Sequence, residues 1–225
     1  MKRIVLVLTA LMLVASFGPA QAQRGGAGGY GYLDHKFELH AFGGYAWTFS
    51  RSVSGYDRDG VWRSGDIDLK DNPYWGLSLD FVLQPGPQVG QLTLLFRTQP
   101  TTVTLKERGI TEDITDVDVN YYHIGGLGGI LRGKAMPFTM LTLGATQYRF
   151  KETGLDDEWR FSIMFGLGAK IYASEKLGLK IQGTLPFTFF NSWFGGYCGT
   201  GGCGMGLSGS GLTQIDVGGG LFLAF

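Results

Sequence analysis

Charged side chains recur at alternate positions in otherwise apolar stretches of this chain. The acidic ones are Glu38, Asp80, Asp118 and Asp216, and the basic ones are Arg97, Arg160, Lys170 and Lys180. With four charges of each sign, every acid has a possible partner, and pairing is what makes charges tolerable in a narrow interior. We therefore predict a lumen charge network made of ion pairs. The alternative interpretation of the same residues is a gated polar path for ions or small solutes.

The spacing of these charges indicates the elements that carry them. In residues 159–173 the odd positions are large and apolar, whereas Arg160 and Lys170 share the even positions with serine and glycine. A period of two indicates a β-strand with one apolar and one polar face. Eight segments follow this pattern, and the fourth and fifth carry apolar residues on both parities, so their facing stays open: 37–49, 74–84, 91–99, 117–131, 138–150, 159–173, 177–190 and 212–225.

The connections between these segments alternate in length. Residues 85–90, 132–137 and 174–176 are short links, whereas residues 50–73, 100–116, 151–158 and 191–211 are longer and polar. Aromatic residues gather at the long-loop ends, as Trp75 and Trp159 do, and more sparsely at the short-turn ends, as Phe138, Tyr172 and Phe225 do. Short turns at one end, long loops at the other and two aromatic girdles are typical of outer-membrane barrels.

The chain divides into three predicted parts. Residues 1–22 have a basic start, an apolar run and Ala20-Gln21-Ala22, which predicts a cleavable signal peptide. Residues 23–36 form a flexible glycine-rich lead, and residues 37–225 form the barrel. Beyond residue 22 no apolar stretch reaches the roughly 18 residues of a membrane helix, and only a closed sheet satisfies its backbone groups in hydrocarbon. The fold prediction is therefore all-β: a closed eight-stranded antiparallel transmembrane β-barrel.

Composition narrows the range of partners. The formal net charge is +0 at pH 7, and nucleic-acid recognition needs a basic face that neutralises phosphates. We therefore expect no nucleic-acid partner. No residue pattern calls for a cofactor, and none is predicted.

The last segment ends in Val217-Gly218-Gly219-Gly220-Leu221-Phe222-Leu223-Ala224-Phe225, an alternating strand that finishes in phenylalanine. This ending resembles the assembly signal of bacterial outer-membrane barrels, and the mature chain as a whole is similar to small barrels of the OmpA-like or opacity-protein type. The resemblance implies residence in the bacterial outer membrane after export and insertion by the outer-membrane assembly machinery, with Phe225 recognised during docking. It further implies contact with outer-membrane lipids and lipopolysaccharide, and we expect a monomer.

Two cysteines, Cys198 and Cys203, lie in the last long loop. Export places them in an oxidising compartment, so we predict a local disulfide. A metal site would need further ligands, and none of the histidines is near them in sequence, so no metal site is predicted.

Three functions are compatible with the sequence. The leading hypothesis is a non-enzymatic barrel with a structural or surface-interaction role through loops 50–73, 100–116 and 191–211. Narrow porin-like transport is an alternative, and so is a lipid-modifying outer-membrane enzyme, which needs a histidine with a serine or acidic partner. His40 is expected to be a hydrogen-bonding lumen residue, and His123 lacks the His-x-Ser spacing of the lipid A deacylases. No catalytic residue is assigned.

Overall fold

The computed structural model describes residues 35–49, 51–56, 62–107, 110–151, 156–199 and 202–225. The predicted signal peptide and most of the predicted lead lie outside the described residues. The strands are β1 (Phe37–Thr48), β2 (Arg51–Tyr56), β3 (Trp62–Leu69), β4 (Asn72–Gln84), β5 (Gln88–Glu107), β6 (Ile110–Ile130), β7 (Ala135–Phe150), β8 (Glu158–Tyr172), β9 (Leu177–Gly199) and β10 (Gly202–Ala224). No helix among the described residues is long and apolar enough to cross a membrane.

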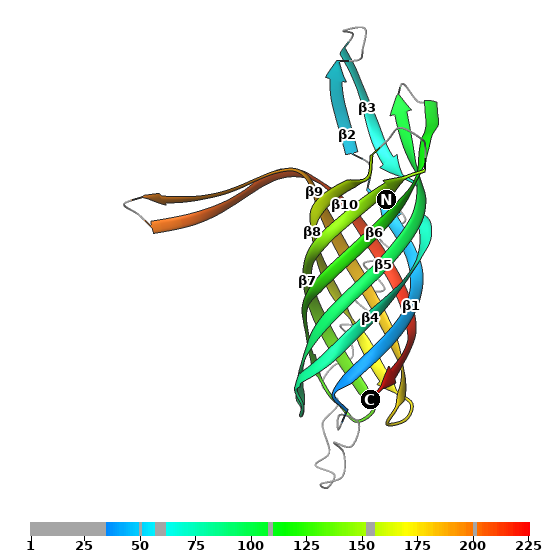
Figure 1. The fold of residues 1–225 in the computed structure, drawn as a ribbon, viewed down its shortest axis with the longest axis vertical. Helices are drawn as coiled ribbons and strands as arrows, with labels where there is room; N and C mark the ends of the chain where they lie inside the picture. The colour runs from blue at the N-terminus through cyan, green and yellow to red at the C-terminus, as the bar shows by residue number, and fades with distance from the viewer. Residues whose placement is uncertain (1–34, 50, 57–61, 108–109, 152–155, 200–201) are drawn as a thin grey trace.

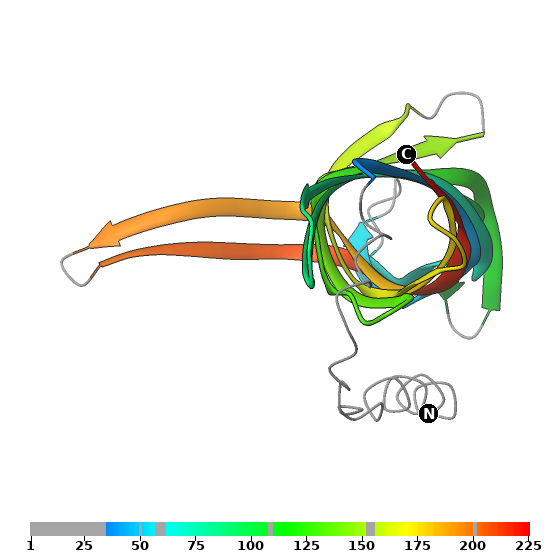
Figure 2. The ribbon, with the colours of Figure 1, turned by 90° about the horizontal axis from the view of Figure 1, so that it is seen from below.

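Eight of these strands close into a barrel, which confirms the predicted fold. Hydrogen bonding runs in the order β4-β1-β10-β9-β8-β7-β6, and the pairing of β6 with β5 and of β5 with β4 completes the ring. All of these pairings are antiparallel. Viewed along its length, the barrel forms a continuous ring of strands (Figure 2).

The outer surface of the barrel is apolar. It carries many exposed aliphatic and aromatic side chains. Among those with 39–59% of their surface accessible are Leu39, Leu77, Leu94, Ile124, Leu141, Leu143, Phe165, Ile181, Leu185, Val217 and Leu221. Water would oppose such a surface, whereas the hydrocarbon of a bilayer matches it. Because the ring of paired strands is closed, the sheet has no free edge along this apolar belt.

The structure also settles the facing of the two ambiguous segments. In β6 the odd positions, such as Tyr121 and Leu127, are buried inside, while Ile124 is exposed outside. In β7 the burial alternates from the first residue, and Met140 points inward. Phe138 and Tyr172 are buried in the lumen, so their predicted place in the short-turn aromatic girdle was wrong.

The seam between β1 and β10 depends on glycine. Gly220 pairs with Phe42, and a Cβ at Gly220 would lie 2.0 Å from the Ala41 carbonyl oxygen and 2.5 Å from the Phe42 Cα. The backbones of the first and last barrel strands therefore approach more closely than any larger residue allows. This close approach lets a narrow barrel close.

Several strands continue beyond the belt. A membrane strand needs about 9–11 residues, whereas β5 and β6 have 20 and 21 and β9 and β10 have 23 each. The β2–β3 hairpin adds to this end through pairing of β3 with the upper part of β5 (Figure 1). Much of three of the four predicted long connections, 50–73, 100–116 and 191–211, is thus paired strand, because the ladders of neighbouring strands continue past the membrane.

Candidate functional site

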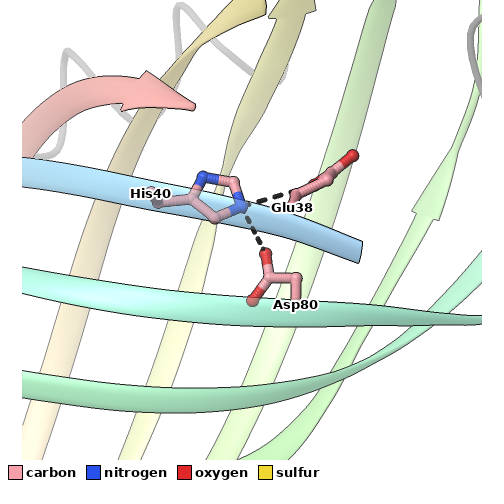
Figure 3. A group of neighbouring side chains, drawn as sticks. All are labelled: Glu38, His40 and Asp80. Carbon is pink, nitrogen blue, oxygen red and sulfur yellow. Dashed lines mark ion pairs between the residues drawn. The ribbon is translucent and has the colours of Figure 1, made fainter. Parts of the chain in front are cut away.

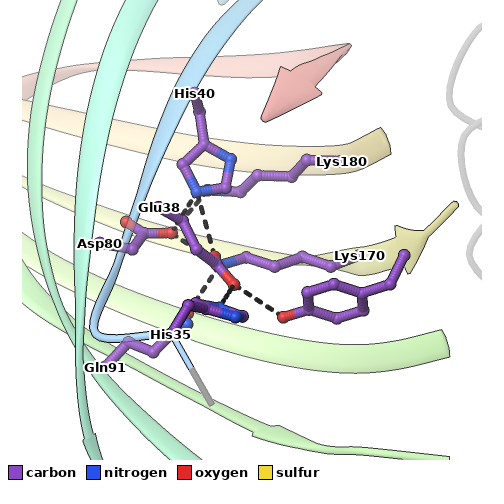
Figure 4. A network of polar contacts seen from close by, with 8 residues as sticks. His35, Glu38, His40, Asp80, Gln91, Lys170 and Lys180 are labelled. Carbon is purple, nitrogen blue, oxygen red and sulfur yellow. Dashed lines mark hydrogen bonds and ion pairs between the residues drawn. The ribbon is translucent and has the colours of Figure 1, made fainter. Parts of the chain in front are cut away.

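The lower part of the lumen, near the short turns, holds a cluster built around Lys170 of β8. Its Nζ donates to the carboxylate of Glu38, to Asp80 Oδ2 at 2.7 Å and to Gln91 Oε1 at 2.6 Å. The partners come from β1, β4 and β5, on the far side of the barrel (Figure 4). The side chains of the three charged residues are fully buried. A single ammonium group therefore ties together strands that do not pair with β8.

The Glu38 carboxylate makes further polar contacts. Tyr172 Oη donates to Oε1 at 2.8 Å, and His35 Nε2 lies 2.8 Å from the same oxygen. The His40 Nε2 atom lies 3.3 Å from Glu38 Oε2 and 2.9 Å from Asp80 Oδ2. Hydrogen bonds and opposite charges on every side are what allow a buried carboxylate to stay ionised.

Lys180 of β9 completes this cluster. Its Nζ lies 3.7 Å from Asp80 Oδ2 and 5.3 Å from the centre of the Phe138 ring. Two acids and two lysines thus share the lower lumen, and their formal charges cancel. We call the set of His35, Glu38, His40, Asp80, Gln91, Lys170, Tyr172 and Lys180 the lower cluster.

Glu38, His40 and Asp80 also satisfy the simplest geometric test for a metal site. One ligand atom from each lies within 4.8 Å of the others (Figure 3). However, the Lys170 ammonium contacts both carboxylates, so it already supplies the cation that the acids require. A divalent ion added beside two lysines would leave a buried excess of positive charge. The geometry therefore favours a tethered ammonium over a metal ion.

A second cluster lies in the lumen nearer the end where the strands extend beyond the apolar belt. We call Tyr74, Arg97, Tyr121, Thr184 and Asp216 the upper cluster. The Arg97 guanidinium pairs with the Asp216 carboxylate through its two terminal nitrogens: Nη1 donates to Oδ2, and Nη2 donates to Oδ1 at 3.3 Å. Thr184 Oγ1 donates to Asp216 Oδ2 at 3.0 Å, so β5, β10 and β9 are joined. The rings of Tyr74 and Tyr121 lie 4.1 and 4.8 Å from Arg97 Cζ. Aromatic faces on a guanidinium add cation–π attraction to the ion pair.

Six of the predicted network residues lie in these two clusters, and two do not. Asp118 is on the outer face of β6, because Val117 and Val119 occupy the inward positions there, and it pairs with Lys151 at 3.0 Å. Its predicted place in the lumen was wrong. Above the apolar belt the outer face meets water, so a charge there needs no enclosure. Arg160 faces inward but lies at the mouth, 35% exposed and paired with Glu158, apart from both clusters.

One buried contact, between a histidine and a serine, was not predicted from the sequence, and these are residue types that nucleophilic catalysis uses. His123 Nε2 lies 2.8 Å from Ser162 Oγ, and His123 Nδ1 lies 2.9 Å from Thr142 Oγ1. The serine comes from β8 and the histidine from β6, so no local spacing reveals the pair. Both hydroxyls are fully buried, and the second imidazole nitrogen contacts a threonine where a catalytic triad has an orienting acid. The group is a buried hydrogen-bonded unit of the lumen wall.

The remaining predicted residues are the two cysteines and Phe225, which lie at opposite ends of the barrel. The backbone register places Cys198 opposite Cys203 in the β9–β10 hairpin, but their side chains lie outside what the structure describes, and the disulfide stays a prediction. Phe225 is 56% exposed and stacks on Phe37 with ring centres 5.3 Å apart. Its role in assembly also stays a prediction.

Comparison with known proteins extends to fold alone. No family model and no curated protein matches the chain. Among solved structures, outer membrane protein AlkL has a TM-score of 0.50 at 10% identity, over 91% of this chain and 96% of that one. OprG from Pseudomonas aeruginosa has a TM-score of 0.49 at 13% identity, covering 85% and 97%. Neisserial surface protein A has a TM-score of 0.44 at 10% sequence identity, over 88% of this chain and 100% of that one. The likeness to AlkL confirms the predicted similarity to small outer-membrane barrels at the level of fold.

Proposed function

We propose that this protein is a sealed, non-enzymatic barrel of the bacterial outer membrane that presents its extended β-hairpins at the cell surface. The observation that carries the proposal is that two buried ion-pair clusters cross the lumen at different heights. A barrel closed in this way offers no open path, so its activity must come from what it presents outside.

The clusters join opposite walls. Lys170 on β8 reaches Asp80 on β4, which lies half-way around the ring. Asp216 accepts from Arg97 on β5 and from Thr184 on β9, which are also half a ring apart. The interior of an eight-stranded barrel is just wide enough for side chains to fill, so one cross-lumen contact at each level is sufficient to block it.

The extensions are fixed to one another by side chains. Lys70 Nζ pairs with Asp113 Oδ2 at 2.7 Å, and Thr102 Oγ1 donates to Asp116 Oδ1 at 2.8 Å. Thr101 Oγ1 donates to the Lys70 carbonyl at 2.7 Å. These contacts link the β3–β4 connection to the upper halves of β5 and β6. They support a structured platform above the membrane, suited to contact with a partner or with neighbouring lipopolysaccharide.

Narrow transport is the second candidate, and one observation favours it. In the lumen wall, Ser78 Oγ, Thr93 Oγ1 and Gln182 Oε1 are buried without a hydrogen-bond partner among the described residues. Buried polar groups of this kind bind water. A solute path would therefore exist if both clusters opened.

Conductance distinguishes the two candidates. Purified protein in planar bilayers is expected to give no channel events over a range of voltages, because each cluster blocks the lumen independently. The matched variant Arg97→Ser/Asp216→Ser should also be silent, since the lower cluster remains. Steady channels in the unmodified protein would overturn the sealed barrel and favour transport.

Surface presentation has its own test. An epitope inserted at residues 57–61, between β2 and β3, should bind antibody on intact cells. The same epitope inserted at residues 85–87, in the β4–β5 turn, should bind only after the outer membrane is permeabilised. Equal labelling of both on intact cells, or labelling only of the turn, would contradict the proposed orientation. An altered lipid A mass spectrum on expression would contradict the non-enzymatic role.

A further inference from the structure

The short-turn end of the barrel carries a rim of basic side chains. They are Lys36 before β1, Arg132 and Lys134 in the β6–β7 turn, and Lys176 in the β8–β9 turn, and all are exposed. Within the described part of the chain, no ion pair includes any of them. The same connections contain one acidic side chain, Glu175. This rim therefore presents an excess of unneutralised positive charge.

The opposite end of the barrel shows the reverse pattern. The basic residues there whose side chains the structure describes are Lys70, Arg149, Lys151 and Arg160, and three of these pair with an acid. Further acids there are Asp71, Asp156 and Asp157. Among the side chains that the structure describes, a surplus of unpaired cations is thus found at the short-turn end.

The basic residues lie where the apolar belt stops. Lys36 precedes Phe37, which is 39% exposed, and Lys176 precedes Leu177, which is 41% exposed. Arg132 comes two residues after Ile130, which is 47% exposed. Long basic side chains at such a boundary rest their stems on apolar surface and extend their charges to the lipid headgroups.

The cations are spread around the ring. They occur at the start of β1, between β6 and β7, and between β8 and β9, which are well separated in the order of the strands. A protein ligand with one docking face would contact a concentrated patch. A charged plane that surrounds the barrel would contact all three positions, and the headgroup layer of a leaflet is such a plane.

We propose that this basic rim binds the anionic headgroups of phospholipids, such as phosphatidylglycerol, in the leaflet that surrounds the short-turn end. Lysine and arginine near an anionic membrane surface each attract it by about 1 kcal/mol at physiological ionic strength, which corresponds to about fivefold in affinity for a contacted headgroup. The assignment of this leaflet to the periplasmic side rests on the orientation in the proposed function. The lipid preference itself does not.

Spin-labelled lipids measure this preference directly. The folded protein in phosphatidylcholine membranes should retain spin-labelled phosphatidylglycerol at its surface several-fold more strongly than spin-labelled phosphatidylcholine. The variant Lys36→Gln/Arg132→Gln/Lys134→Gln/Lys176→Gln should lose the preference. Molar salt, which shortens the screening length to about 3 Å, should remove it from the unmodified protein as well.

A matched variant removes the same number of charges at the other end. Lys70→Gln/Arg149→Gln/Lys151→Gln/Arg160→Gln should keep the full preference for phosphatidylglycerol. The proposal is overturned if the unmodified protein shows no preference, if the rim variant retains it, or if both variants lose it equally. Weaker binding of the rim variant to purified peptidoglycan, with its lipid preference unchanged, would also overturn it and assign the rim to the cell wall. Channel events in planar bilayers would refute the sealed barrel and leave this result standing.

Discussion

Replacement of Lys170 by alanine is expected to lower the free energy of unfolding of the barrel by about 3–5 kcal/mol, the usual cost of leaving a buried charge without its partner. The ammonium contacts Glu38, Asp80 and Gln91, and its removal leaves two fully buried carboxylates close together with Lys180 as the one remaining lysine beside Asp80. Unfolding by denaturant in lipid vesicles, followed by tryptophan fluorescence, measures the loss. Lys176→Ala, a change of the same residue type in an exposed turn, should stay within about 0.5 kcal/mol.

The same variant tests the view that Lys170 takes the place of a metal ion. Without the ammonium, Glu38, His40 and Asp80 offer two carboxylates and an imidazole within 4.8 Å, which is a ligand set that Zn²⁺ accepts. Refolding with Zn²⁺ should recover part of the lost stability in Lys170→Ala and none of it in Lys170→Ala/His40→Ala. If Zn²⁺ stabilises the unmodified protein equally, the ammonium is not the resident cation.

Replacement of Asp216 by alanine is expected to cost a similar amount, about 3–5 kcal/mol. Arg97 would keep its position between Tyr74 and Tyr121 but lose the carboxylate that neutralises it. The double variant Arg97→Met/Asp216→Leu should be clearly more stable than the single one, because replacing both members of a buried pair by apolar groups of similar size is far less costly. A double-mutant cycle gives the coupling between the two side chains.

Asp118→Ala is the control for this prediction. Asp118 has the same residue type and the same predicted lumen role, but the structure places it outside the lumen, 30% exposed and paired with Lys151. Exposed pairs contribute about 0–1 kcal/mol, so its replacement should change stability little. A loss as large as that of Asp216→Ala would place Asp118 in the enclosed interior after all.

The barrel itself was predictable because its signal is local. In β8 the odd positions such as Trp159, Phe161 and Ile171 are exposed and the even positions such as Ser162 and Lys170 are buried, because the side chains of a strand point alternately to opposite faces. The same logic placed Glu38, Asp80, Lys170 and Asp216 inside. This alternation predicts the facing least well in β6 and β7. There Leu127 and Met140 are apolar yet face the lumen, so odd and even positions both carry apolar residues.

The contacts were beyond prediction because they join strands that are distant in sequence. Lys170 and Glu38 are 132 positions apart, Arg97 and Asp216 are 119 apart, and His123 and Ser162 are 39 apart. Which charge meets which depends on the register and tilt of the whole ring, since those set the height of each side chain in the lumen. Asp118 shows the same dependence. Val117 and Val119 point into the upper lumen, so Asp118 between them must point outward.

The sequence alone thus determined that this chain forms a closed barrel with an apolar exterior and a charged interior, because alternation is a property of each strand by itself. Only the tertiary structure decided how the charges pair, that they form two separate clusters across the lumen, and that the outer segments continue as paired strands. Those features depend on closure of the ring, which brings together residues that no local pattern connects.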